Sequence, residues 1–341
     1  MQVFHAPLTD RHNPQSFLVL GSIRVAAEQP ERRHRLLSAA AAAGHDIQEA
    51  PPPPPLALER VHTSDYLGFL RTAHAEWSAN PAAAPEVIPN LHPNRHMAAH
   101  PHPGTGIVGR AGWYQADGAC PIGPHTWEAA LASAGCAVAA ADAVLAGAEA
   151  AYALCRPPGH HAYSDLAGGF CYLNNVAIAA EVLLQRYDRV AILDIDVHHG
   201  NGTQGIFWRR ADVLTLSIHA DPTRYYPYFA GFADEVGEGA GAGFNLNLPL
   251  PHGSGDAAVL AALDTALARI KDFDAGTVLI ALGLDAADAD PLGVFAVSTQ
   301  GFETIGQRLT QLDRPLVLVQ EGGYLCDALG ASLAAVLRGV G

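Results

Sequence analysis

The chain has 341 residues, of which 49% are hydrophobic and 16% charged, a composition that excludes a largely disordered protein and supplies a sizeable core. Its 34 acidic side chains outnumber the 20 basic ones, and the formal charge of −14 argues against a nucleic-acid partner, which needs a basic surface. The five cysteines are widely spaced and form no CxxC motif, so neither a disulfide framework nor a thiolate zinc site is indicated.

Two further properties of the whole chain bear on its surroundings. The N-terminal segment, MQVFHAPLTD, lacks the basic region and apolar stretch of a signal peptide, and no apolar run reaches the ~20 residues that span a bilayer. We therefore expect a cytoplasmic protein without a membrane partner. The acidity is typical of a well-solvated surface, but it would also attract a cationic small molecule.

In chain order, short apolar runs alternate with longer amphipathic ones. The short runs predict strands at Ala151–Cys155, Arg189–Asp194, Val213–His219, Phe244–Leu250, Thr277–Gly283 and Pro315–Gln320. The amphipathic runs predict helices at Pro30–Ala43, Ser64–Trp77, Thr126–Ala146, Asn175–Arg186, Asp256–Lys271, Gln300–Gln311 and Leu329–Gly339. This alternation indicates an α/β protein with a central, mainly parallel sheet that is covered by helices on both faces.

Two segments depart from this alternation. Pro51–Pro55 predicts a rigid surface connector in the polyproline II conformation. Residues 79–125 are rich in proline and histidine and show little periodicity, and so long a segment in a compact protein is usually functional or an interaction element. No internal repeat or domain boundary is evident, so we expect one domain over residues 1–341.

Four polar segments each follow a predicted strand, and ligands of parallel sheets bind at the carboxyl ends of strands. Arg156–Ala162 (RPPGHHA) carries two adjacent histidines, which are suggestive only together with partners from elsewhere in the chain. Asp194–Gln204 (DIDVHHGNGTQ) follows a buried strand, and the alternation of side chains puts Asp194, Asp196 and His198 on one side. Two carboxylates buried there without a cation would be costly, which favours a metal site.

The other two segments could complete such a site. In Ala281–Gly293, Asp285 comes first after the strand and is best placed to supply a further ligand, whereas Asp288 and Asp290 are more typical of loop-capping residues. In Gln320–Tyr324 two glycines precede a tyrosine, so the backbone can approach a ligand closely and direct one phenol. A packed tyrosine is an equally good interpretation of that phenol.

Together these side chains predict hydrolytic chemistry. Two oxygen ligands and one nitrogen leave zinc an open position, as in catalytic sites, and a water bound there would have a pKa near neutrality. A histidine could accept the proton of that water, and a phenol could stabilise the oxyanion that forms. The sequence has neither a Gly-x-Ser-x-Gly motif nor a cysteine-nucleophile signature, so a metal-assisted attack on an amide or ester is favoured.

These motifs, with GGFCYLNN at residues 168–175, resemble those of the histone deacetylase superfamily, above all its bacterial acetylpolyamine amidohydrolases and histone-deacetylase-like amidohydrolases. The resemblance covers nearly the whole chain. It implies an arginase-like α/β fold, with a parallel sheet of about eight strands between helical layers. It also implies one catalytic zinc ion per chain, bound by Asp196, His198 and Asp285, although ferrous iron could serve as well.

The resemblance further implies the roles of individual residues. His161, oriented by Asn201, would be the general base and then the general acid, and His160, hydrogen-bonded to Asp194, would act electrostatically. Tyr324 would bind the oxyanion. The substrate channel would be lined by Gly169, Phe170 and Tyr226. A structural monovalent cation such as K⁺ would lie near Asp194, Asp196, His198 and Ser217. We interpret His199 and His219 as structural residues rather than catalytic ones.

The substrate is less well indicated. The N-terminal segment and residues 79–125 resemble those of the acetylpolyamine amidohydrolases, in which such loops constrict the channel and build a dimer, so we expect a homodimer and a small acetylated amine. The polyamine enzymes have acidic channel mouths, whereas this chain offers Asp117 and the mouth histidines His92, His96, His100 and His102. An amidase for other small acyl amides, including xenobiotics, a protein acetyl-lysine deacetylase and a metal-binding protein without turnover are the alternatives.

Overall fold

The computed structural model describes residues 1–97 and 102–341, so His100 lies outside the described residues. The central sheet has eight strands in the order β4-β1-β5-β10-β9-β6-β7-β8, and all neighbouring pairs are parallel. The strands are β1 (Gln2–His5), β4 (Asp46–Glu49), β5 (Ala150–Ala153), β6 (Val190–Asp194), β7 (Val213–Ala220), β8 (Asn245–Leu250), β9 (Thr277–Leu282) and β10 (Leu316–Gln320). These strands confirm the predicted parallel sheet.

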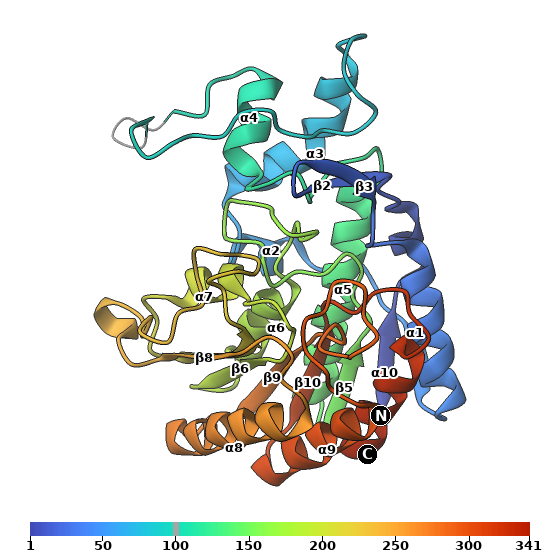
Figure 1. The fold of residues 1–341 in the computed structure, drawn as a ribbon, viewed down its shortest axis with the longest axis vertical. Helices are drawn as coiled ribbons and strands as arrows, with labels where there is room; N and C mark the ends of the chain where they lie inside the picture. Colours follow the sequence, from blue (N-terminus) through green and yellow to red (C-terminus); the bar gives the residue numbers. More distant parts are fainter. Residues whose placement is uncertain (98–101) are drawn as a thin grey trace.

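Two strands of the sheet were not predicted from the sequence. β1 and β4 have four residues each, with the sequences QVFH and DIQE, and in them only Val3 and Phe4 are buried. Such short and polar segments carry no clear period of two. The unpredicted hairpin of β2 (Ser16–Val19) and β3 (Ser22–Val25) is antiparallel and lies apart from the main sheet (Figure 1).

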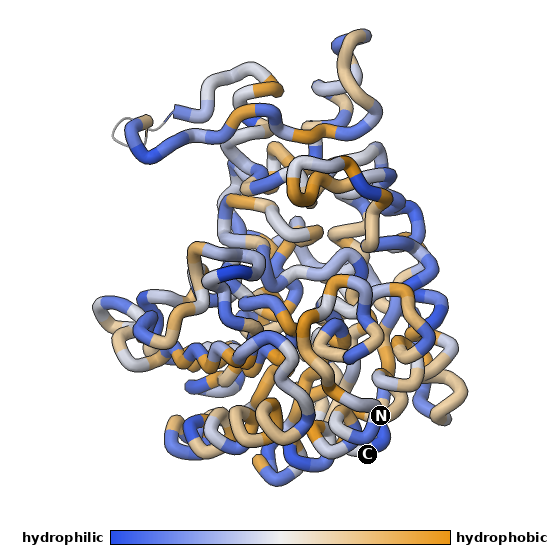
Figure 2. The backbone as a smooth tube through the Cα atoms, in the orientation of Figure 1, coloured by the Kyte–Doolittle hydropathy of each residue, from blue (hydrophilic) through white to orange (hydrophobic). Residues whose placement is uncertain are grey.

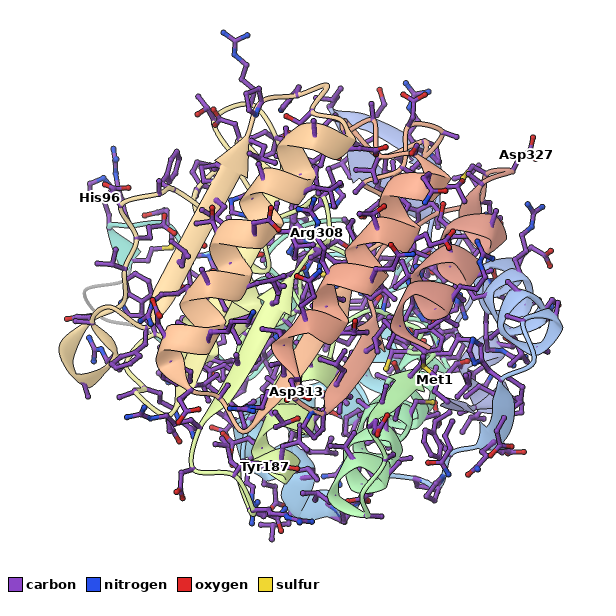
Figure 3. All side chains as sticks on the ribbon, turned by 90° about the horizontal axis from the view of Figure 1, so that it is seen from below. Met1, His96, Tyr187, Arg308, Asp313 and Asp327 are labelled. Carbon is purple, nitrogen blue, oxygen red and sulfur yellow. The ribbon has the colours of Figure 1, made fainter. Side chains whose placement is uncertain are left out.

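Helices cover both faces of the sheet, as predicted. One layer contains α5 (Thr126–Leu145) and α6 (Asn175–Leu183), whose buried side chains pack on one face. The other contains α1 (Pro30–Ala42), α8 (Asp256–Phe273), α9 (Thr299–Leu309) and α10 (Leu329–Val340), and Figure 3 shows α8, α9 and α10 beside one another across this face. Figure 2 shows the hydrophobic residues concentrated along the strands between these layers.

The remaining helices correct several expectations. α3 (Ser64–Ser78) was predicted, but α2 (Pro55–Glu59), α4 (Ile107–Tyr114) and α7 (Asn201–Phe207) were not. Residues 79–125 therefore contain a helix, and the connector at Pro51–Pro55 ends in the first residue of α2. These helices have five to eight residues, too few for a clear helical period.

Helix α5 also corrects the statement that no apolar run is long enough to cross a membrane. It has 20 residues and is apolar enough to do so by length and composition. However, 78% of its apolar window is buried inside the protein, so in this structure α5 is a core helix. It packs against α6 and β5, which explains why nearly all of its faces are apolar.

The strand order determines where the polar segments lie. The four strands that precede them, β5, β10, β9 and β6, are consecutive neighbours in the sheet. Because all pairs are parallel, their carboxyl ends meet at one edge, which faces upward in Figure 1 toward α3, α4 and the hairpin. All four predicted segments are thus brought to the same place.

Candidate active site

A group of three side chains at this edge could hold a metal ion. One ligand atom each from Asp196, His198 and Asp285 lies within 4.8 Å of the others. The first two residues follow β6 and Asp285 follows β9, the strand hydrogen-bonded to β6. The Nδ1 atom of His198 is 3.0 Å from an oxygen of Asp196 and 3.2 Å from Oδ2 of Asp285. The three residues that the sequence proposed as ligands therefore converge.

The chemistry of this group fits a divalent cation. Both carboxylates are fully buried, and Oδ2 of Asp285 accepts no hydrogen bond from any residue that the structure describes. Burial and the negative charge of Asp196 raise the pKa of Asp285 to about 7. A buried carboxylate oxygen that accepts no hydrogen bond is costly, and a cation would satisfy it. Two oxygens and one imidazole nitrogen suit a catalytic zinc site with an open position.

Gly322 lets the loop after β10 approach this group closely. Its backbone N–H donates a hydrogen bond to Oδ2 of Asp196 at 2.8 Å. A Cβ atom at this position would meet the carboxylate oxygens of both Asp196 and Asp285. The glycine is therefore required by the close packing of the backbone on the carboxylates, in agreement with the interpretation of the two glycines before Tyr324.

The histidine pair lies beside the metal group, with ring centroids 4.0 Å apart. The Nδ1 atom of His160 is 2.8 Å from Oδ2 of Asp194, and that of His161 is 2.6 Å from Oδ1 of Asn201. The oxygens of Asp194 and Asn201 only accept, so each histidine donates from Nδ1 and its Nε2 atom remains for other chemistry. Both hydrogen bonds were predicted from the family resemblance.

The two histidines differ in charge. Burial opposes the charged form of His160, but the carboxylates of Asp194 and Asp196 outweigh it and raise its pKa well above the usual value. For His161, burial comes first and the positive charges of His160 and His198 add to it, so its pKa lies well below the usual value. His161 is therefore a neutral imidazole that can accept a proton, next to a cationic His160.

Tyr324 is buried beside the metal group. Its backbone N–H donates to Oδ2 of Asp290 at 2.6 Å, and the guanidinium of Arg32 lies 4.8 Å from the centre of its ring. Its hydroxyl makes no hydrogen bond with a described residue. Burial raises the pKa of this hydroxyl well above its usual value, although Arg32 acts in the opposite direction. The phenol thus stays protonated and can donate a hydrogen bond.

The chain matches the family model of the histone deacetylase domain over residues 26–340. The chain belongs to the histone deacetylase family. This confirms the family predicted from its motifs. The chain is 46% identical to the acetylpolyamine amidohydrolase of Burkholderia pseudomallei, over 100% of this chain and 99% of the relative. It is 42% identical to acetylpolyamine amidohydrolase 1 of Pseudomonas aeruginosa, over 96% and 95% of the two chains.

The fold agrees with this assignment. The crystal structure of an acetylpolyamine aminohydrolase from Burkholderia pseudomallei superposes with a TM-score of 0.95 at 45% identity, covering 99% of this chain and 98% of that one. The eight-stranded parallel sheet is thus that of a histone deacetylase family protein, and the deacetylase-like fold expected from the resemblance is confirmed.

In this family member two of the predicted channel residues, Gly169 and Tyr226, lie against His161, and the third, Phe170, lies against Tyr324. The ring of Tyr226 lies edge-on to His161 with centroids 4.8 Å apart, and that of Phe170 lies 5.7 Å from the ring of Tyr324. Gly169 has a φ of +51°, and a Cβ there would meet the ring of His161 and the Tyr226 hydroxyl. Gly169, Phe170 and Tyr226 thus lie next to the catalytic candidates His161 and Tyr324, and their role as channel walls stays a prediction.

The predicted cation site is only partly assembled by side chains. Asp194 and Ser217 are paired across β6 and β7 and line a cavity of about 10 Å³. The side chains of Asp196 and His198 belong to the metal group instead. The hydroxyl of Ser217 is 2.8 Å from Nδ1 of His219. A K⁺ ion at this place stays a prediction.

The described mouth histidines do not gather around the metal group. His92 and His102 line a different cavity of about 550 Å³, together with Trp113, Asp165 and Leu166. His96 is exposed and lies at the periphery of the molecule in Figure 3. From the same segment, Asp117 does reach the channel residues, because its carboxylate accepts hydrogen bonds from Gly169 and Tyr226.

Sequence reasoning missed three residues that contact the site. Oε2 of Glu321 accepts hydrogen bonds from the backbone N–H groups of Gly159 and His160, at 2.6 and 3.0 Å, and so holds the histidine loop. Arg32 on α1 donates to the carbonyls of Glu321 and Gly323. Tyr225 stacks on His198 at 4.8 Å. Glu321 could have been found from its place in the EGGY motif, but no local pattern distinguishes Arg32 or Tyr225.

Proposed function

We propose that this protein is a zinc-dependent amidohydrolase that removes acetyl groups from small aliphatic amines, acetylpolyamines among them. The observation that carries the proposal is the convergence at one sheet edge of a three-residue metal group, a neutral His161 and a Tyr324 hydroxyl that bonds to no described residue. Relatives at 46% and 42% identity over nearly the whole chain are named acetylpolyamine amidohydrolases, which supports an acetyl amide as the substrate.

Asp196, His198 and Asp285 would hold the zinc ion, which when bound acts as a Lewis acid toward the acyl oxygen and acidifies a water molecule. His161 accepts the proton of the attacking water at Nε2, because its Nδ1–H is directed at Asn201. The same imidazolium then protonates the leaving amine. His160, kept cationic by Asp194, stabilises the negative charge that develops nearby, and the Tyr324 hydroxyl donates to the oxyanion.

The proposal is tested by rates on acetylputrescine, acetylspermidine, an acetyl-lysine peptide and a simple aryl amide with one enzyme preparation. We expect the acetylpolyamines to have the highest kcat/KM. Dialysis against a chelator should abolish turnover, and zinc or ferrous ions added back should show which metal restores it. A higher rate on the peptide would favour a protein deacetylase, and a higher rate on the aryl amide an amidase of other scope. No turnover of any substrate by a zinc-loaded protein would leave a metal-binding protein.

Replacing Tyr324 by phenylalanine should lower kcat on acetylputrescine by about 10²–10³-fold, the usual effect of losing one oxyanion donor. Since its hydroxyl bonds to no described residue, the melting temperature and the zinc content should stay at wild-type values. Steady-state kinetics and elemental analysis measure these quantities. Tyr228→Phe, which removes a hydroxyl from an exposed tyrosine, is the matched control. A wild-type rate for Tyr324→Phe would remove the phenol from the mechanism.

The role of residues 79–125, the oligomeric state, the location and the second ion are proposed from the family resemblance. The contacts of Asp117 with Gly169 and Tyr226 support a role of residues 79–125 in shaping the channel. A homodimer built through the same segment, a cytoplasmic location and the structural K⁺ ion stay predictions. Gel filtration of the purified protein would decide the first of these.

A further inference from the structure

Asp117 joins three separate segments of the chain at the channel. Its Oδ1 atom accepts a hydrogen bond from the backbone N–H of Ala119 at 2.8 Å, within its own loop. Its Oδ2 atom accepts one from the N–H of Gly169 at 3.2 Å and one from the hydroxyl of Tyr226 at 2.7 Å. Gly169 precedes α6 and Tyr226 follows β7, so one carboxylate connects two sides of the channel.

One of the two segments that Asp117 holds is in a conformation that needs support, and the other carries a ring that contacts the base. Gly169 and Phe170 have φ values of +51° and +70°, and the left-handed region is unfavourable for a bulky residue such as Phe170. The Tyr226 ring stands edge-on to the base His161, at 4.8 Å and 85°. Its hydroxyl points away to Asp117, and burial raises its pKa well above the usual value, so the phenol remains a donor. A displacement of either segment would move a wall that touches the catalytic side chains.

These contacts also occupy the carboxylate. An ionised carboxylate offers about four lone-pair sites, and three of those on Asp117 already have donors from the protein. We propose that Asp117 is a positioning residue, which fixes the channel walls through Gly169 and Tyr226, and that it does not bind the cationic end of the amine substrate. This inference rests on the proposed function, because it assigns what the acidic residue at the mouth does during amide hydrolysis.

The test compares acetylputrescine with N-pentylacetamide, in which a methyl group replaces the ammonium. If Asp117 positions the walls, Asp117→Ala and Tyr226→Phe should each lower kcat on both substrates by the same factor, about 10- to 100-fold. The kcat of the double variant should be no lower than that of the less active single variant, because both substitutions break the same contact. Asp117→Asn, whose one amide oxygen can still accept from Gly169 and Tyr226 but not also from Ala119, should recover part of the rate. Asp188→Asn removes an exposed carboxylate outside these contacts and should leave both rates unchanged.

A different pattern would overturn the inference. If Asp117 binds the cation, Asp117→Ala would raise KM for acetylputrescine alone, and Tyr226→Phe, which frees the carboxylate, would lower it. Hydrogen exchange of the Gly169 amide in the purified full-length protein provides a readout independent of turnover. It should accelerate in Asp117→Ala and less in Asp117→Asn, and unchanged exchange would refute the positioning role. A wild-type protein that hydrolyses neither amide would instead refute the proposed function, while the exchange result would still judge Asp117.

Discussion

Asp285→Ala is expected to purify almost free of zinc and to have no measurable turnover. The change removes one of three converging ligand atoms, and we expect metal affinity to fall by more than the ~10–100-fold that is typical for loss of an outer-shell partner. It also removes the buried carboxylate oxygen that accepts no hydrogen bond from a described residue and that a cation would satisfy. Elemental analysis after dialysis measures the effect, together with a zinc titration of the metal-free protein.

The same loop supplies the matched control for this prediction. Asp288 lies three residues further on, is exposed and belongs to no metal group found among the described residues. Asp288→Ala should therefore retain the zinc content and kcat of the wild type. Full zinc occupancy in Asp285→Ala would refute its assignment as a ligand, and equal losses in the two variants would indicate a general disturbance of the loop.

The second large effect is expected at the histidine pair. His161→Ala should lower kcat by about 10²–10⁴-fold, the usual contribution of a general acid–base residue. His160→Ala should lower it less, because a cationic His160 contributes charge without transferring the proton. Single-turnover rates on acetylputrescine separate the chemical step from product release. Both variants should be compared at equal zinc content and with their melting temperatures measured, since His160 also anchors Asp194.

The order of the two effects decides the roles. A larger loss in His160→Ala would exchange the base and the electrostatic partner. Asn201→Ala adds a further comparison, since it removes only the acceptor at Nδ1 of His161. We expect the kcat of Asn201→Ala to lie between those of the wild type and His161→Ala, because the His161 ring keeps its proton-accepting nitrogen but loses the hydrogen bond that orients it. An effect as small as that of a surface substitution would show that Asn201 does not orient the ring.

The sequence by itself determined the class of fold and the residues that carry the chemistry. Apolar runs located β5, β6, β7, β8, β9 and β10 within a few residues, because buried parallel strands are continuously hydrophobic. The motifs after them identified Asp196, His198 and Asp285 as candidate ligands, and the structure brings these residues together. The family resemblance added the pairs His160–Asp194 and His161–Asn201. Each of these residues lies within a motif shared with the family, so its role could be transferred residue by residue.

Only the tertiary structure decided which strands are neighbours and which distant side chains meet at their ends. The order β5-β10-β9-β6 places the four polar segments side by side. Two strands that are neighbours in the sheet, such as β5 and β10, can be more than a hundred residues apart in the chain. Contacts such as those of Arg32 with Glu321 and of Asp117 with Tyr226 depend on this long-range pairing. Hydrophobic periodicity reports which face of one segment is buried, but not which other segment covers it, and so it could not reveal them.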